Sequence, residues 1–262
     1  MVDLAADIGL ELISLTDHDT LEGIPEARAR ASERGLELMP GVEISTQHPR
    51  GGERHVLAHG IEIEDEPLRR ALAANATARE ERLLRMLDAL ATAGLVIAEA
   101  DVRAHARGSI GRPHVADAMV RQGLVKSRQE AFDRWLGDGK VGHVKKASLD
   151  AARAIELVHR AGGVATLAHP GRRWDLALVE DLVRLGLDGV EVIHPSNAAP
   201  QQAALRDAAE RWGLLVTGGS DNHGDAEGRQ TMKMQIVPRA LADAVAVRVR
   251  ERQVRRVMGA GA

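Results

Sequence analysis

Several histidines of this chain come directly after short apolar runs of the sequence. Four of them lie within a few residues of the end of such a run: His18, His169, His194 and His223. A single histidine in that position is more often a surface or helix-capping residue than a ligand. In parallel α/β enzymes, however, the carboxyl ends of the strands converge, so side chains that follow several strands meet in one place. Four such histidines therefore indicate a shared site.

Carboxylates accompany these histidines. Glu43 lies within the segment Pro40–Ser45, His55 lies in the next apolar segment, and Asp221 precedes His223 by two residues. Imidazole nitrogens with carboxylate oxygens, and no sulfur, suit Mn, Zn, Fe or Ni, and carboxylate-rich positions tolerate Mn or Mg. A carboxylate can bridge two ions, which can generate a hydroxide and clamp the oxygens of a phosphoryl group. We therefore expect a site for divalent metal ions.

Basic residues elsewhere are candidate contacts for a phosphate. Arg112 and His114 open a predicted helix, where free N–H groups and positive side chains can hold an anion. The alternative is that Pro113 is simply a first-turn residue and Arg112 is solvated. Lys146 and Arg172 are further candidates, each weak by itself because basic side chains usually face water.

The pattern of apolar residues predicts the elements that would position these side chains. We expect strands at 12–15, 36–39, 42–46, 54–60, 164–168, 189–193, 214–217 and 232–237. We expect helices at 2–8, 20–34, 148–160, 175–185, 198–212 and after Pro238. In the segment between residues 65 and 148, helical patterns cover parts of 66–147, including 98–106, 113–122 and 127–136. The alternation predicts an α/β fold with a parallel sheet, most economically a barrel of residues 1–65 and 148–262, with a helical insert at 66–147.

Composition narrows the function. The 262 residues include 44% hydrophobic and 28% charged residues, an ordinary balance for a folded domain, and the net charge of −3 supplies no global positive field for nucleic acid. With no cysteine, disulfides, thiolate metal sites and cysteine nucleophiles are excluded. One Phe and three Trp are few stacking platforms for long single strands. No apolar run or signal peptide indicates a membrane, so we expect a cytoplasmic protein.

Six motifs in order resemble the polymerase-and-histidinol-phosphatase (PHP) family of metal-dependent phosphoesterases. They are Leu15–Thr20, Pro40–Ser45, Gly111–His114, Ala168–Arg172, Gly189–Pro195 and Gly219–His223. Their order and spacing are closest to the branch of 3′,5′-nucleoside bisphosphate phosphatases and related 5′-to-3′ exoribonucleases. The resemblance covers nearly the whole chain and implies a distorted TIM-like (β/α)7 barrel with a helical insert.

The resemblance also implies roles for the residues in these motifs. Glu43 would bridge the first and second of up to three metal ions, and Asp221 would ligate the first. His55 and His169 would complete the second site. His18 and His223 would hold the third ion, with Asp17 orienting His18.

Substrate contacts follow from the same resemblance. His194 would be a proton donor or a phosphate contact. Arg112 and His114 would hold the substrate in the insert, and Lys146 and Arg172 would contact its phosphate groups. The partner would be a small phosphorylated nucleotide or short RNA, not a long duplex and not a membrane.

One family feature does not occur in this sequence. The family begins with a strand that carries His-x-His, followed by an Asp, whereas Met1 falls within the helix that comes next. We therefore expect a barrel without its first strand and fewer bound ions, with a misplaced start or truncation favoured over an evolved loss. The expected activity is removal of the 3′-phosphate of nucleoside 3′,5′-bisphosphates, or trimming of short RNA from its 5′ end, by metal-hydroxide attack. The alternative is a metal-poor, inactive domain that serves as a binding or regulatory module.

Overall fold

A computed structural model describes residues 1–104, 109–145, 147–171, 175–222 and 232–259 of the chain. The chain divides into two compact units. Unit 1 contains Met1–Ala71 and Leu149–Ala262, and unit 2 contains Leu72–Ser148. Each unit has its own core and is described separately.

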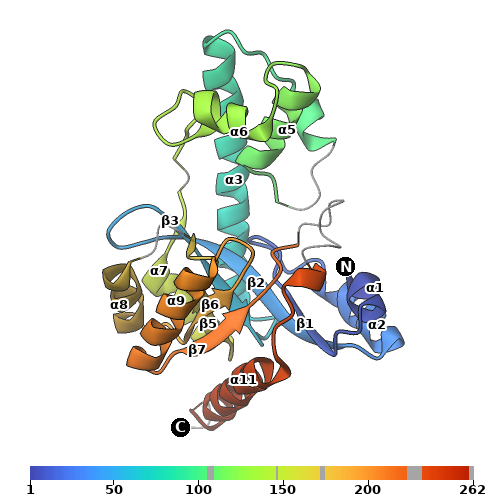
Figure 1. Cartoon of the computed structure of the whole chain (residues 1–262), viewed down its shortest axis with the longest axis vertical. Coiled ribbons are helices and arrows are strands. Elements are labelled where there is room, and N and C mark those ends of the chain that lie inside the picture. The colour runs from blue at the N-terminus through green and yellow to red at the C-terminus, as the bar shows by residue number, and fades with distance from the viewer. Residues whose placement is uncertain (105–108, 146, 172–174, 223–231, 260–262) are drawn as a thin grey trace. The chain divides into compact units, whose positions relative to one another are not determined.

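Unit 1 is built on a curled, mixed sheet (Figure 1). Its strands are β1 (Leu12–Leu15), β2 (Glu37–Gln47), β3 (Glu53–His59), β4 (Leu149–Asp150), β5 (Val164–Leu167), β6 (Gly189–Ile193) and β7 (Leu215–Gly218). Their order is β1-β2-β3-β5-β6-β7, with the two-residue β4 paired to the end of β2. Fully buried branched side chains such as Ile44, Val56 and Val190 fill its interior. This curled sheet is the α/β scaffold that the sequence predicts.

Strand β2 is one continuous strand, where the sequence analysis expects two. Pro40 lies at the point where its pairing changes. Up to Pro40 the strand pairs with β1, and from Gly41 it pairs with β3 on the other side. Proline has no N–H to donate to a neighbouring strand, and the Pro40 carbonyl accepts the N–H of Gly60 at 2.8 Å. The expected break is therefore a change of partner.

The sheet is not wholly parallel, which corrects the sequence prediction. Strand β3 runs antiparallel to both β2 and β5, whereas β1–β2, β5–β6 and β6–β7 are parallel. The connection between β2 and β3 contains residues 48–52, which is too short for a parallel crossover. As a result, the start of β3 lies beside the carboxyl ends of β2 and β5.

Helices of unit 1 cover the sheet. They are α1 (Val2–Asp7), α2 (Ile24–Arg34), α7 (Ala151–Arg160), α8 (Leu176–Arg184), α9 (Ala199–Trp212) and α11 (Arg239–Gly259). Helix α2 begins later than the expected residue 20, because its N-cap is Gly23 and Pro25 follows in the first turn. Helix α7 begins after Asp150, whose carboxylate accepts the N–H groups of Ala152 and Arg153. None of the described helices is long and apolar enough to cross a membrane.

The strand expected at 232–237 is wrong. Residues 232–234 are helical, and 235–238 lie in no strand. Met232 is buried against the core beside α1 and α2, but Met234 and Ile236 are exposed. The alternation of methionines with polar residues therefore does not reflect burial on one face of a sheet.

The described residues of unit 2 form helices joined by turns and loops. Helix α3 (Glu66–Thr92) supplies much of it, followed by α4 (Glu99–Arg103), α5 (Arg112–Arg121), α6 (Arg128–Ala131) and a π-helical turn (Phe132–Leu136). Leu83, Met86 and Leu90 of α3 pack with Met119 and Leu136 in one buried cluster. Leu83 and Leu90 of α3 thus belong to the core of this unit, whereas Leu84 is exposed.

Candidate metal centre

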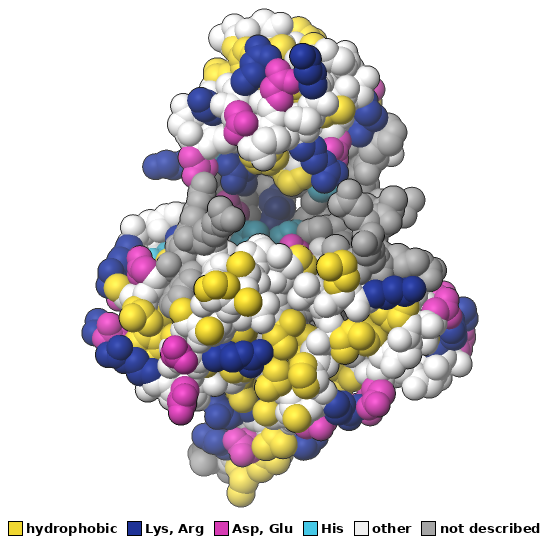
Figure 2. Space-filling view, in the orientation of Figure 1, with side chains coloured by type: hydrophobic (Ala, Val, Ile, Leu, Met, Phe, Trp, Pro, Cys, Tyr) yellow, Lys and Arg dark blue, Asp and Glu magenta, His cyan; other side chains and the backbone are white. Residues whose placement is uncertain are grey.

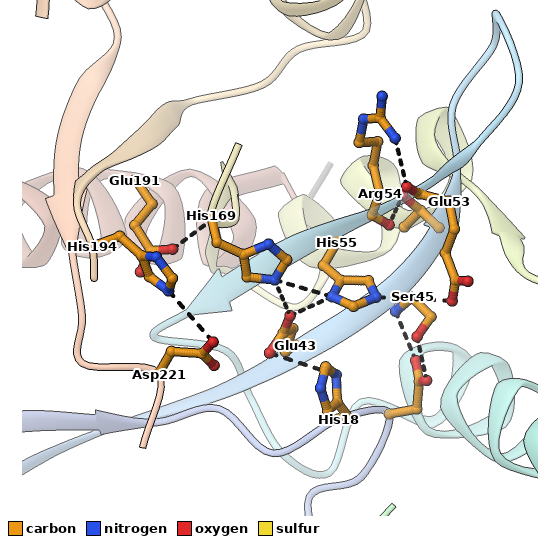
Figure 3. Close-up of polar contacts among 12 residues, drawn as sticks. His18, Glu43, Ser45, Glu53, Arg54, His55, His169, Glu191, His194 and Asp221 are labelled. Atoms are coloured by element: carbon orange, nitrogen blue, oxygen red, sulfur yellow. Dashed lines mark hydrogen bonds and ion pairs between the residues drawn. The ribbon is translucent and has the colours of Figure 1, made fainter. Parts of the chain in front are cut away.

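Backbone pairing brings His18 to Glu43. Beyond β1 the chain stays beside β2, where the Asp19 N–H donates to the Glu43 carbonyl at 2.9 Å. The Glu43 N–H in turn donates to the Asp17 carbonyl at 3.1 Å. The His18 Nδ1 atom consequently lies 3.5 Å from Oε2 of Glu43 (Figure 3). A residue after one strand and a residue inside the next therefore share one site.

Two further imidazoles reach the other oxygen of the Glu43 carboxylate (Figure 3). Nδ1 of His55 lies 2.5 Å from Oε1 of Glu43, and Nε2 of His169 lies 2.8 Å from the same oxygen. These two nitrogens are 3.1 Å apart. His55 can take part because β3 is antiparallel, which places its first residues beside the ends of β2 and β5.

The buried Glu43 carboxylate controls the protonation of this cluster. Burial raises its pKa, but the hydrogen bonds from His169 and His55 outweigh burial and hold the pKa well below the usual range. For His55, burial lowers the pKa, while contacts with the Glu43 and Glu53 carboxylates raise it to about 9. The pKa of His169 is also raised, because its hydrogen bond to Glu43 outweighs desolvation. The Glu43 carboxylate thus favours the protonated forms of His55 and His169.

A second group lies beside this cluster. Nε2 of His194 lies 3.5 Å from Oδ2 of Asp221, and the His194 side chain is almost fully buried. The backbone N–H of Ser196 donates to Nδ1 of His194 at 3.0 Å. Because Nδ1 accepts, the neutral ring carries its proton on Nε2, the atom that faces Asp221.

The backbone is strained at three of these positions. Asp19, His169 and Asp221 are the non-glycine residues with positive φ in the described ranges, at 53°, 23° and 49°. Such conformations cost about 1–3 kcal/mol each and persist where the surroundings impose them. All three lie in or beside the His–carboxylate group, with one residue in each of the segments that follow β1, β5 and β7.

The donor set fits a divalent metal ion. Ligand atoms of His18, Glu43 and His55 all lie within 4.8 Å of one another. Metal–ligand bonds of about 2.0–2.2 Å separate neighbouring ligand atoms by about 3 Å or slightly more. The spacings of 3.5 Å for His18–Glu43 and 3.1 Å for His55–His169 are of this size. Two carboxylate oxygens facing separate imidazoles also suit a bridging role for Glu43.

Comparisons with known proteins agree with this chemistry. No family model matches the chain. It is 36% identical over 220 residues to a 5′-3′ exoribonuclease of Haemophilus influenzae, covering 82% of this chain and 80% of the relative. It is 32% identical over 236 residues to a 3′,5′-nucleoside bisphosphate phosphatase of Chromobacterium violaceum, covering 87% and 82%.

A solved structure supports the same relationship. The chain superimposes on a protein described as a metal-dependent phosphoesterase from Bifidobacterium adolescentis with a TM-score of 0.84 and 32% identity. The match covers 94% of this chain and 89% of the other. The chain belongs to the PHP family of metal-dependent phosphoesterases.

Among the predicted ligands of this PHP protein, five lie in the two groups described above: His18, Glu43, His55, His169 and Asp221. His194, expected to contact phosphate or donate a proton, faces Asp221. His223, Lys146 and Arg172 lie outside the described residues.

Arg112 and His114 lie at the start of α5 in unit 2 of the PHP protein. The Arg112 guanidinium contacts Asp138 at 3.2 Å and stacks over the Phe132 ring. His114 accepts the Gly111 N–H through Nδ1. Pro113 is a first-turn residue, as the simpler interpretation holds, but Arg112 is not merely solvated.

Sequence reasoning missed two carboxylates that hold the PHP centre together. Asp19, buried to 2% exposure, accepts hydrogen bonds from the N–H and the hydroxyl of Ser45. Glu191, on β6 and also buried, accepts the N–H of His169. Both residues lie inside the six sequence motifs. A carboxylate within a motif that has no assigned ligand role was therefore the signal that could have identified them.

Proposed function

We propose that this PHP protein removes the 3′-phosphate of nucleoside 3′,5′-bisphosphates or trims short RNA from its 5′ end. The observation that carries the proposal is the Glu43 carboxylate facing imidazoles on both oxygens, beside the His194–Asp221 pair. Relatives named as a 5′-3′ exoribonuclease and a 3′,5′-nucleoside bisphosphate phosphatase support this choice of substrate.

Glu43, His55, His169 and His18 are proposed to hold divalent metal ions, with Mn²⁺ favoured and Zn²⁺, Fe²⁺ or Mg²⁺ as alternatives. Asp221, and His223 outside the described residues, would add further donors. When bound, such ions supply an activated water and neutralise charge on a phosphoryl group. Up to three ions are proposed for the site, with Glu43 and Asp221 as donors to the first.

His194 is proposed as the proton donor or phosphate contact. Its Nε2–H faces the site, because the Ser196 N–H occupies Nδ1. The neutral Nε2–H in this place can hydrogen-bond a phosphoryl oxygen, whereas protonation of the departing oxygen requires the imidazolium form of the ring. Burial limits competition from water, which strengthens that hydrogen bond.

Arg112 and His114 are proposed to bind the substrate from the insert, taken as residues 66–147, with Lys146 and Arg172 as further phosphate contacts. A planar guanidinium beside an aromatic ring is suited to bidentate phosphate binding. The substrate is proposed to be small. Figure 2 shows acidic and basic side chains interspersed over the visible face of unit 1, and the net charge is −3.

The decisive experiment measures phosphate release from adenosine 3′,5′-bisphosphate by purified protein with Mn²⁺. Asp221→Ala is expected to abolish turnover, because the variant removes the carboxylate that faces His194. Asp188→Asn is the control, because Asp188 is a buried carboxylate just before β6, at the end of the strand away from the site. It should retain turnover per folded molecule. Full activity in Asp221→Ala would refute the assignment of the site.

The second candidate is a metal-poor, inactive module that binds phosphorylated ligands. The same side chains could bind a ligand without catalysis if too few of them are available to coordinate a metal ion tightly. Metal analysis separates the two: fewer than one tightly bound ion per chain, with no turnover, supports the module. An ion in each chain together with phosphate release supports the enzyme.

A further inference from the structure

Glu191 lies on β6, between the two strands, β5 and β7, that lead into the site. Strand β6 pairs with β5 on one side and with β7 on the other. His169 follows β5 and Asp221 follows β7. The Glu191 side chain is 5% exposed and points towards both segments (Figure 3). It is the charged side chain of β6.

One oxygen of Glu191 is committed to the backbone of His169. The His169 N–H donates to Oε2 of Glu191 at 2.6 Å. This N–H belongs to a non-glycine residue with φ of 23°, a conformation that its own side chain disfavours. The hydrogen bond fixes that backbone, and the backbone in turn directs the imidazole so that Nε2 reaches Glu43 at 2.8 Å.

The other oxygen of Glu191 packs against the segment that leads to Asp221. A Cβ placed on Gly219 would lie 3.0 Å from Oε1 of Glu191. The Gly219 N–H donates to the Ile193 carbonyl at 2.9 Å, and the β6–β7 register shifts between Glu191 and Ile193. The carboxyl group therefore contacts both the His169 segment and the Gly219 segment that leads to Asp221.

We propose that Glu191 is a positioning residue that sets the direction of the His169 imidazole through the His169 backbone. It is not a ligand in this assignment, because its Oε2 is taken by the N–H and its Oε1 faces Gly219. The inference rests on the proposed function, since it assigns His169 to a metal site. Its physical content is separate: without a hydrogen-bond acceptor at Glu191, the His169 backbone relaxes and the donor nitrogen moves away from Glu43.

The chain offers a matched control at the opposite end of the same strand pair. Asp188, just before β6, accepts the N–H of Ala165 near the start of β5 at 2.9 Å. Both carboxylates are buried, and both accept one backbone N–H from the β5 segment. Asp188, however, contacts His159 and Arg252 and is remote from Glu43. Substituting Asp188 tests stability without touching the His169 segment.

The test compares Glu191→Gln, Glu191→Leu and Asp188→Asn in the full chain. Mn²⁺ binding is measured by calorimetry without substrate, beside the melting temperature and the kcat and KM for adenosine 3′,5′-bisphosphate. Glu191→Leu should weaken Mn²⁺ binding by about 10–100-fold, the usual effect of removing a partner of a ligand. Glu191→Gln keeps an acceptor oxygen and should bind Mn²⁺ within about threefold of the parent chain. Asp188→Asn should lower the melting temperature but leave Mn²⁺ affinity unchanged.

Two results would overturn the inference. If Glu191→Gln loses as much affinity as Glu191→Leu, the negative charge is what matters and Glu191 acts as a ligand. If Glu191→Leu keeps its Mn²⁺ affinity, the residue is structural. Should Glu191→Leu fail to fold, Glu191→Met supplies the same test, since its side chain also lacks an acceptor for the His169 N–H and should weaken Mn²⁺ binding. Mn²⁺ binding without phosphate release in the parent chain would count against the proposed function and leave this comparison intact.

Discussion

The Asp19 carboxylate, in the segment after β1, accepts two hydrogen bonds from Ser45 on β2. Oδ1 accepts the Ser45 N–H at 2.9 Å, and Oδ2 accepts the Ser45 hydroxyl at 2.7 Å. Both residues are buried, and Asp19 holds a left-handed backbone conformation. This contact ties the residue after His18 to the residue two positions beyond Glu43, so it sets the distance between those two side chains.

Asp19→Ala should therefore destabilise the fold and loosen the metal centre. The variant leaves the buried N–H and hydroxyl of Ser45 without their acceptor, which costs about 2–4 kcal/mol in total. Chemical denaturation measures this loss. Ser45→Ala removes one of the two hydrogen bonds and should cost about 1 kcal/mol. Equal stability in Asp19→Ala and the parent chain would contradict the bracing role.

Metal binding should release protons, because the pKa of His55 is raised to about 9 and a ligand nitrogen must be deprotonated. The pKa of His169 is raised as well. Below pH 9 the proton displaced from His55 weakens the apparent affinity by about tenfold for every unit that the pH falls. Titration of Mn²⁺ in buffers with different ionisation enthalpies counts the protons. An enthalpy independent of the buffer would argue that these imidazoles are not the ligands.

His59 should make the protein sensitive to acid. Its ring is enclosed between the hydroxyls of Ser14 and Thr166, and burial lowers its pKa to about 4. The unfolded chain thus binds a proton more readily than the folded one between pH 6.5 and 4. Stability from this residue is complete above pH 6.5 and falls as the pH drops towards 4.

The measurement is the free energy of unfolding from pH 7.5 to 4 in the parent chain and in His59→Met. The difference between the two chains isolates His59 from His55 and His169. Those two have raised pKa values and act in the opposite direction, losing their stabilisation as the pH rises. The pH dependence over this window should be shallower in His59→Met. Identical slopes would show that His59 does not titrate there.

Asp188 should anchor α11 to the sheet of unit 1. Its carboxylate accepts two N–H groups from the Arg252 guanidinium at 2.8 Å each and one from Ala165 at 2.9 Å. Desolvation raises its pKa, but His159 and Arg252 outweigh it and lower the pKa to about 2. The stabilisation is present above the unfolded value near 3.8 and is lost as the pH falls towards 2.

Asp188→Asn should cost about 3 kcal/mol, because it leaves the Arg252 charge without its partner. Hydrogen exchange should increase in α11 more than in β2 and β3. Protection in α11 equal to that of the parent chain would contradict the anchoring role.

Local sequence determined much of the scaffold. The strands at 12–15 and 189–193 have the expected bounds, because short β-rich runs between turn residues carry a strong local signal. The types of the candidate ligands also follow from the sequence, since nitrogen and oxygen donors without sulfur restrict the metals that fit. The relatives confirm the predicted phosphoesterase class.

Tertiary structure decided how those residues meet. The direction of β3 depends on the length of its connection and on its contacts with β5, and this direction brings His55 to Glu43. The hydrogen bonds of Asp19 to Ser45 and of Glu191 to His169 join residues 26 and 22 positions apart. No local periodicity encodes such pairs, because periodicity reports which face of an element is buried and not which buried groups become partners.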